Sequence, residues 1–149
     1  MLVQQEYIGL LIGAARRKIK QSVSLRSEPH KLSTLQFWVL VALQSSPGLS
    51  LSQLAELQRM EMPNASRVVT SLVKRRLVKL KRDSADRRRA VLELTAGGQR
   101  MARKLQRPAD LVRDAQVAGM TSEEVETLCA LLHRVIDNLE KLDAASEQV

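Results

Sequence analysis

Between residues 50 and 94 the hydrophobic pattern changes once, from helical spacing to alternation, and this change limits the possible fold more than any other feature. Two short segments, Leu51 to about Gln58 and Pro63 to Arg75, have apolar residues at helical spacing. Leu77–Lys81 and Arg89–Leu94 then suit extended strands, with a charged stretch, 82–88, between them. Two short helices joined by a tight turn predict a helix-turn-helix, and a hairpin directly after it predicts a wing.

The residues before this region also predict helices. Val3–Val23 has apolar side chains at helical spacing and predicts one amphipathic helix. Ser24–Lys31 is polar and contains a proline, which predicts a connection. Ser33 followed by Gln36 forms a capping box, so a second helix begins there and ends at the Ser-Ser-Pro-Gly of residues 45–48. The pair Ser50 and Gln53 repeats the capping box at the start of the helix-turn-helix.

The residues after the hairpin predict two longer helices. Thr95 caps the first, which should bend or weaken at Pro108 and close at Gly119. A third capping box, Thr121 with Glu124, opens the second. Along that last helix apolar residues recur in steps of three and four, at Val125, Leu128, Leu132, Val135, Leu139 and Leu142. This heptad spacing predicts a helix that packs lengthwise against another helix, either in the core of the same chain or in a second copy.

The charge of the chain is unevenly distributed. The net charge is +8, but residues 58–104 hold 14 basic and 4 acidic residues, whereas residues 105–149 hold 4 basic and 9 acidic ones. A localised basic region indicates a polyanionic partner, with nucleic acid the first candidate and a solvated surface the alternative. The acidic end is distant in sequence from this region, which favours dimerisation as its role. Aromatic residues make up only 2%, which argues against a protein that stacks the bases of single strands.

Other functional classes lack their signals in the sequence. The single cysteine, Cys129, allows no internal disulfide, fits a reducing cytoplasm and is expected to be a small buried side chain, with a redox switch as the alternative. His30 and His133 lie far apart and no metal-ligand spacing occurs, so neither a metal nor a cofactor is expected. Without a glycine-rich phosphate loop, the chain is not expected to be an enzyme. The apolar stretch Ile8–Ala15 is shorter than the ~18 residues of a membrane span, so a cytoplasmic protein is expected.

Several of these segments, taken in order, resemble the MarR family of bacterial transcriptional regulators. They are Leu32–Gln36, Pro47–Glu56, Ala65–Val69, Asp86–Arg88, Leu94–Thr95 and Gly98. The resemblance covers nearly the whole chain and implies a mainly α fold with a small β-wing. A winged helix-turn-helix, residues 32–96, would lie between an N-terminal dimerisation helix, 1–31, and C-terminal dimerisation helices, 97–149. It also implies a homodimer on double-stranded DNA, with the recognition helix in the major groove and the wing in the minor groove.

The resemblance assigns the site residues one by one. On the recognition helix the matching positions are Asn64, Ser66 and Arg67. At the wing, Asp86 would orient the hairpin and Arg88 would contact DNA, with Arg87 beside it. Helix capping is the alternative for Asn64, and an exposed ion pair is the alternative for Asp86 with Arg88. Further contacts to phosphate are expected from Thr70, Lys74, Arg75, Lys79, Lys81 and Arg82.

One position departs from the family pattern. Where the family has glycine, between the recognition helix and the first wing strand, this chain has Arg76. A left-handed backbone there would strain an arginine by about 1 kcal/mol or more. Either the turn differs, or Arg76 is tolerated as an added phosphate contact.

The resemblance further implies a repressor that binds a palindromic operator and is released by a small, often phenolic, effector. An effector near Tyr7, Leu11, Phe37 or Trp38 would lie in a mostly apolar cleft, although these residues can also be plain core. Two other functions compete with this interpretation: a constitutive architectural or RNA-binding protein, and a membrane-surface protein that uses its first helix. Specific, salt-dependent binding to one palindromic duplex distinguishes the first, and binding to liposomes the second.

Overall fold

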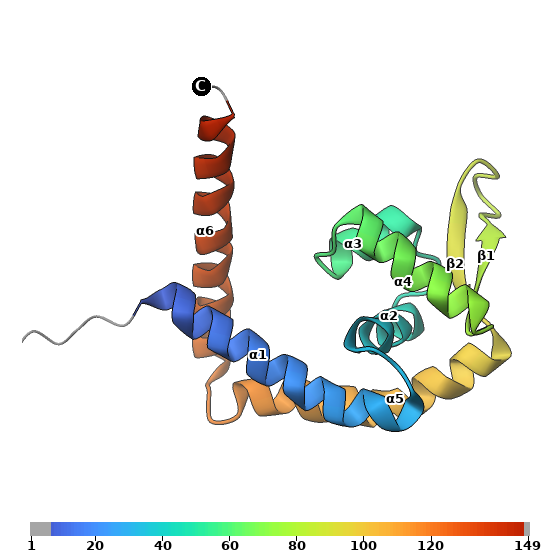
Figure 1. The fold of residues 1–149 in the computed structure, drawn as a ribbon, viewed down its shortest axis with the longest axis horizontal. Coiled ribbons are helices and arrows are strands. Elements are labelled where there is room, and N and C mark those ends of the chain that lie inside the picture. Colours follow the sequence, from blue (N-terminus) through green and yellow to red (C-terminus); the bar gives the residue numbers. More distant parts are fainter. Residues whose placement is uncertain (1–6, 148–149) are drawn as a thin grey trace, which may run out of the picture. The chain divides into compact units, whose positions relative to one another are not determined.

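The computed structural model describes residues 7–147 and divides the chain into two units, Met1–Arg113 and Asp114–Val149 (Figure 1). The elements follow in the order α1 (Ile8–Ser27), the 3₁₀ turn η1 (Glu28–His30), α2 (Thr34–Ser45), α3 (Leu51–Leu57), α4 (Met62–Lys74), β1 (Val78–Arg82), β2 (Ala90–Leu94), α5 (Ala96–Val117) and α6 (Ser122–Ser146). The predicted fold class, mainly α with a small β-wing, is confirmed.

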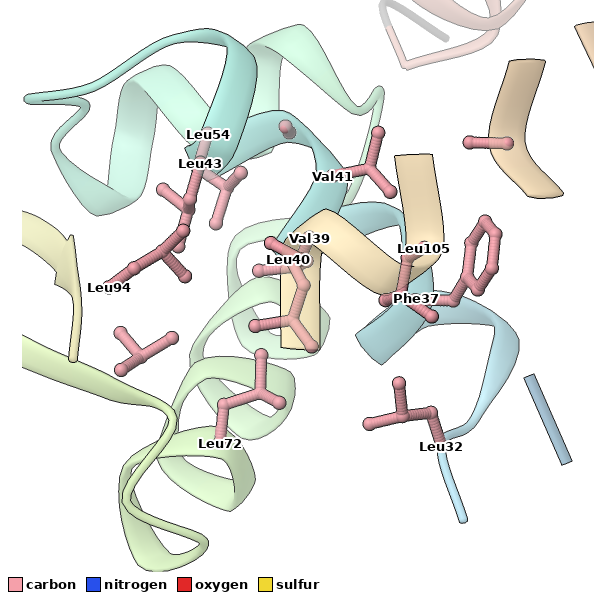
Figure 2. Close-up of a cluster of buried hydrophobic side chains, with 14 of the residues drawn as sticks. Leu32, Phe37, Val39, Leu40, Val41, Leu43, Leu54, Leu72, Leu94 and Leu105 are labelled. Carbon is pink, nitrogen blue, oxygen red and sulfur yellow. The ribbon is translucent and has the colours of Figure 1, made fainter. Parts of the chain in front are cut away.

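Helix α2 forms the centre of the first unit. Its residues Val39–Leu43 are all buried, as is Phe37, so the helix is covered on nearly every side. Figure 2 shows leucines from four neighbouring elements gathered around it, namely Leu54, Leu72, Leu94 and Leu105. The core is aliphatic apart from Phe37, as the low aromatic content predicts. The helix-turn-helix and the wing are thereby packed on one common support.

The helix starts follow the capping residues in the sequence. At α2, α3 and α6 both hydrogen bonds of the capping box are present, made by Ser33 with Gln36, Ser50 with Gln53, and Thr121 with Glu124. Each box satisfies backbone N–H groups that the first turn of a helix leaves unpaired. These three predicted starts are confirmed.

The first helix differs from its predicted bounds. It begins at Ile8 and continues to Ser27, four residues beyond the predicted end at Val23, so the first half of the expected connection Ser24–Lys31 is helical. The predicted start at Val3 lies outside the described residues. Val23 and Ser27 are the buried residues of α1, and both belong to the last turns of the helix. Packing of this end against the core therefore outweighs the polar composition that indicated a loop.

Three turns of the first unit place a basic residue in the left-handed region, with φ angles of 56° at Lys31, 50° at Arg59 and 57° at Arg76. At Arg76 the backbone N–H donates to the carbonyl of Val73, and that of Leu77 donates to the carbonyl of Leu72. This is the hydrogen-bond pattern of a Schellman helix end, in which the left-handed position is usually glycine. The departure from the family pattern therefore lies in the residue and not in the turn, and Arg76 holds the strained conformation.

The start of α5 is packed directly on that turn. The Thr95 hydroxyl accepts from the N–H of Gly98 at 3.0 Å and donates to the carbonyl of Arg76 at 2.7 Å, while the Thr95 N–H donates to the carbonyl of Leu77. A Cβ on Gly98 would overlap the Leu77 carbonyl oxygen, so only glycine fits this position. The helix then continues through Pro108. Thr95 thus caps α5, as predicted, and also joins it to the base of the wing.

Helix α6 differs from the helices of the first unit in the burial of its side chains. Its 25 residues include no buried side chain. Leu128, Leu132, Leu139 and Leu142 of the predicted heptad series are between 38% and 61% exposed. Within its own unit, Asp114–Val149, this series therefore has no covering element among the described residues. Cys129, on the same helix, is exposed, contrary to the expectation of a small buried side chain.

Candidate nucleic-acid interface

The predicted recognition helix, α4, buries one face and exposes the other. Ala65, Val69 and Leu72 point into the core. The five predicted contact residues of the helix are exposed, namely Asn64, Ser66, Arg67, Thr70 and Lys74. Ser66, Thr70 and Lys74 follow one another at intervals of four and so lie along a single line on the helix surface. The buried residues hold this line in place from behind.

Two of these residues act together. A terminal nitrogen of Arg67, Nη2, donates to Oδ1 of Asn64 one turn earlier. The N-cap of α4 is Glu61, and Asn64 occupies the third helical position. The capping alternative for Asn64 is therefore wrong, because its side-chain oxygen accepts from Arg67 and not from the backbone. This contact limits the directions in which the Arg67 guanidinium can point.

The wing is a two-stranded antiparallel hairpin in which Val78 pairs with Leu94 and Arg82 with Ala90. Val78 and Leu94 are buried, which anchors its base in the core. The tip projects away from the helices (Figure 1) and carries Arg87 and Arg88, both exposed. The structure thus presents two neighbouring arginines at the end of the ribbon.

Asp86 shapes this tip through the backbone. Its Oδ1 accepts from the N–H of Arg88 at 3.0 Å, and its carbonyl accepts from the N–H of Arg89. Within the described hairpin Asp86 and Arg88 form no ion pair, so the alternative of an ordinary exposed pair does not hold. The Asp86 side chain instead closes a short turn of the kind that aspartate favours, and the Arg88 side chain is left to point outward.

Several basic side chains expected at phosphate are engaged within the chain. Lys79 and Lys81 both lie 3.6 Å from carboxylate oxygens of Glu93. Arg82 donates to the carbonyl of Arg87 at 2.8 Å and so holds the two sides of the tip together. Each remains more than half exposed or has unused donors, so a phosphate contact is compatible with these bonds.

Arg75 has a structural role in addition to the phosphate contact expected of it, which stays a prediction. Its Nη1 donates to the carbonyl of Lys31 at 2.6 Å and its Nη2 to the carbonyl of His30 at 3.3 Å. These bonds tie the end of α4 to the connection before α2. Such a link between residues more than 40 positions apart has no local sequence signal.

Sequence reasoning missed two further residues of this region. Nε2 of Gln36 donates to the hydroxyl of Ser71 at 2.8 Å, which connects the cap of α2 to the middle of α4. Arg89, at the end of the tip, reaches Gln53 of α3. Both glutamines were identified only as capping residues. The capping box gives the local role of each side chain, whereas the second bond depends on tertiary packing.

The four effector-binding candidates differ in burial. Phe37 is fully buried and Trp38 is partly buried against it, with their ring centroids 5.2 Å apart. Tyr7 and Leu11 are 69% and 46% exposed near the beginning of α1. At about 1.5 Å per residue, Leu11 lies ~12 Å along the helix from Ile19, a partly buried residue of α1 that packs against the same core. Trp38 also faces a cation, because the Arg113 guanidinium lies 5.2 Å from its ring centroid.

Other kinds of site have little support in the described residues. No group of three or more His, Cys, Asp and Glu side chains in residues 7–147 could hold a metal ion. None of the helices described is long and apolar enough to cross a membrane.

Comparison with known proteins extends over most of the chain. Residues 30–89 match the model of the MarR family. The HTH-type transcriptional regulator YybA of Bacillus subtilis is 28% identical over 87% of this chain and 87% of its own length.

Two solved structures show the same fold. MepR of S. aureus, in complex with DNA, has a TM-score of 0.77 at 21% identity and covers 91% of this chain and 99% of its own. BpsR of Bordetella bronchiseptica, whose DNA binding is regulated by 6-hydroxynicotinic acid, has a TM-score of 0.73 at 23% identity over 92% of this chain and 98% of its own. The family model matches the helix-turn-helix and the wing as far as Arg89, and proteins of the same fold match most of the chain, so the chain is similar to regulators of the MarR family.

Proposed function

We propose that the protein is a homodimeric transcriptional repressor that binds a palindromic operator and is released by a small aromatic effector. In this proposal residues 32–96 bind DNA, and residues 1–31 and 97–149 hold the dimer together. The observation that carries it is the exposed face of α4 beside an arginine-tipped wing, both supported by the core around α2. MepR, which has this fold, is solved in complex with DNA.

The residues divide by the kind of contact they make. Arg67 is proposed to bind a guanine edge in the major groove, since its planar fork matches two acceptors on that base, and Asn64 orients it. Ser66, Thr70 and Lys74 lie along the same helix face and contact the backbone or neighbouring bases. Arg87 and Arg88 enter the minor groove, while Asp86 and Arg82 maintain the tip.

Dimerisation is proposed from the state of α6. A helix whose apolar series has four exposed leucines and no buried residue gains stability by packing against another helix. A second copy supplies an identical surface and also the two-fold symmetry that a palindrome requires. The two recognition helices would then lie about one DNA turn apart, ~34–36 Å.

For the effector we propose the surface of Trp38 and Arg113. An aromatic acid can stack on the indole ring while its carboxylate pairs with the guanidinium. BpsR, which is regulated by an aromatic acid, has the same fold. Phe37 supports the Trp38 ring from the core, whereas Tyr7 and Leu11 are exposed near the beginning of α1 and are not needed for this site. Because Trp38 is the only tryptophan of the chain, quenching of its fluorescence reports binding directly.

The decisive experiment is selection of bound duplexes from random DNA, with and without aromatic acids. The proposal predicts one enriched palindrome, steep loss of binding with salt, and release by at least one acid that also quenches Trp38. A reporter gene behind the selected site should be silenced by the protein and expressed when that acid is added. Equal retention of all duplexes would instead support a constitutive architectural protein.

Base recognition is tested separately. Arg67→Ala should reduce the preference for the selected palindrome over random duplexes, because a lost bidentate base contact costs about 1–3 kcal/mol of discrimination. Lys74→Ala is the matched control on the same face and should weaken binding to all duplexes alike. Undiminished preference in Arg67→Ala would place base recognition on other residues.

A further inference from the structure

Arg89 is the one arginine of the wing whose side chain turns back toward the helices. It follows the tip and precedes β2. Its Nη2 donates to Oε1 of Gln53 in α3 and to the carbonyl of Gly48 at 3.4 Å, and its Nη1 lies 4.0 Å from a carboxylate oxygen of Asp83. The contacts with Gln53 and Gly48 join the outer end of the wing to the start of α3, and the one with Asp83 holds the guanidinium within the hairpin; together they are here called the Arg89 tether.

The acceptor on α3 has a second partner. Oε1 of Gln53 also accepts from the N–H of Ser50 at 3.0 Å, as the third helical residue of the capping box. The Gln53 side chain therefore both caps the first turn of α3 and accepts the hydrogen bond from Arg89 of the wing. Nearer the base, the N–H of Leu92 donates to the carbonyl of Leu49 at 2.8 Å. The wing is thus fastened to the segment before α3 at two levels, one through the backbone and one through Arg89.

The tether matters because the hairpin is small. Two strands of five residues are marginally stable by themselves. Buried side chains anchor the base of the hairpin. All residues of β1 after Val78 are exposed, as are Arg87 and Arg88. An unfastened tip would have to be ordered when DNA binds, which weakens association. A guanidinium can prevent this because its planar fork holds several acceptors in one orientation.

We propose that Arg89 is a positioning residue that locks the wing to α3, so that Arg87 and Arg88 are held at a set distance from α4, and that it does not itself contact DNA. The inference rests on the proposed function for its DNA-binding consequence. The lock itself belongs to the free protein. Both terminal nitrogens of Arg89 are bonded to acceptors of the chain, and its side chain is 38% exposed.

The lock is tested first without DNA, by amide hydrogen exchange in the full chain. The N–H of Asp83 donates to the carbonyl of Arg89 and reports on the closed end of the hairpin. Arg89→Ala and Gln53→Ala should each speed exchange of this amide about tenfold. Gln53→Glu is the matched variant, because glutamate retains the capping box and offers Arg89 a carboxylate, so exchange should stay at the wild-type rate or slow. Unchanged exchange in Arg89→Ala overturns the proposal.

The consequence for DNA is tested by a double-mutant cycle on the selected operator. Arg89→Ala should weaken binding about tenfold in the wild-type background, and less than twofold when Arg87 and Arg88 are already alanine. Arg89→Lys should behave like alanine, since an ammonium cannot hold the three acceptors in one plane. Additive losses would mean that Arg89 contacts DNA itself and would overturn the proposal. Failure of the wild type to select any operator counts against the proposed function, and the exchange rates then decide the lock alone.

Discussion

The helix-turn-helix and wing differ from α6 in where their partners lie. In the first region each helix and both strands bury apolar side chains within the same chain, and polar side chains such as Gln36 and Arg75 connect elements far apart in sequence. Helix α6 has an equally regular apolar series and a complete capping box, yet no buried residue. The same spacing of apolar residues can therefore occur on a helix that packs within its own chain and on a helix that is available to a second molecule.

The contrast fits two different requirements. A region that binds DNA must present its contacts with little freedom, so that ordering them on the duplex costs little. A dimer helix must instead remain open until its partner arrives. Four changes test this comparison, two of them by breaking one side of it and two by sharpening it.

Gly98→Ala should break the packed side with the largest effect. The new methyl overlaps the Leu77 carbonyl, and the backbone there is held by Thr95, so we expect a loss of about 3 kcal/mol in unfolding free energy and roughly 10 °C in Tm. Gly97→Ala is the control, because its nearest neighbours would lie 3.7 Å from the methyl. Thermal and urea unfolding measure both. Equal stability of the two variants would show that the close approach at Gly98 does not exist.

Leu132→Glu combined with Leu139→Glu should disrupt the proposed dimer surface of α6. Two charges on the apolar series should dissociate the dimer and reduce operator binding about 100-fold, while the packed unit keeps its unfolding transition. The control places the same two charges at Ala130 and Ala144, which lie on the opposite face of the heptad. Analytical ultracentrifugation and fluorescence anisotropy provide the readouts. If the Leu132→Glu, Leu139→Glu variant still sedimented as a dimer, the dimer interface would lie on other residues.

Arg88→Ala sharpens the comparison within the packed region. It compares an exposed arginine at the wing tip with a lysine that forms an ion pair within the chain. We expect about tenfold weaker operator binding with unchanged dimerisation and Tm, because the Arg88 side chain supports no contact of the fold. Lys79→Ala, whose partner is Glu93, should change affinity less than threefold. Titrations at several salt concentrations compare the two. Equal effects would remove the wing tip from the interface.

Arg76→Gly should give the smallest change and the opposite sign. Glycine relieves the left-handed strain at φ 57°, so we expect about 1 kcal/mol of added stability. If Arg76 contacts phosphate, the slope of log K against log salt should fall by about 0.9 as well. Arg76→Asn, which tolerates the same backbone without a charge, should lose the same slope with a smaller gain in stability. A lower melting temperature for Arg76→Gly would contradict the strain argument.

Sequence patterns predicted the local parts of this molecule well. The capping boxes and the change from helix to hairpin each depend on residues within a few positions of one another, whereas the sequence leaves two alternatives for the turn at Arg76, which the structure shows to be left-handed. The bounds of α1 were wrong, because its last turn is stabilised by Val23 and Ser27 packing on the core and not by its own polar composition. The candidate contact residues of α4 and the tip are all exposed, and their roles on DNA remain predictions.

The sequence by itself determined the order of helices and strands, the starts of α2, α3 and α6, and the basic character of the region between 58 and 104, since these follow from backbone hydrogen bonding and side-chain spacing over one or two turns. Only the tertiary structure decided that Arg75 and Arg89 serve the fold, that Gln36 and Gln53 have second partners, and that α6 is uncovered. Contacts between residues 35 to 45 positions apart arise when elements pack, and no local pattern encodes them.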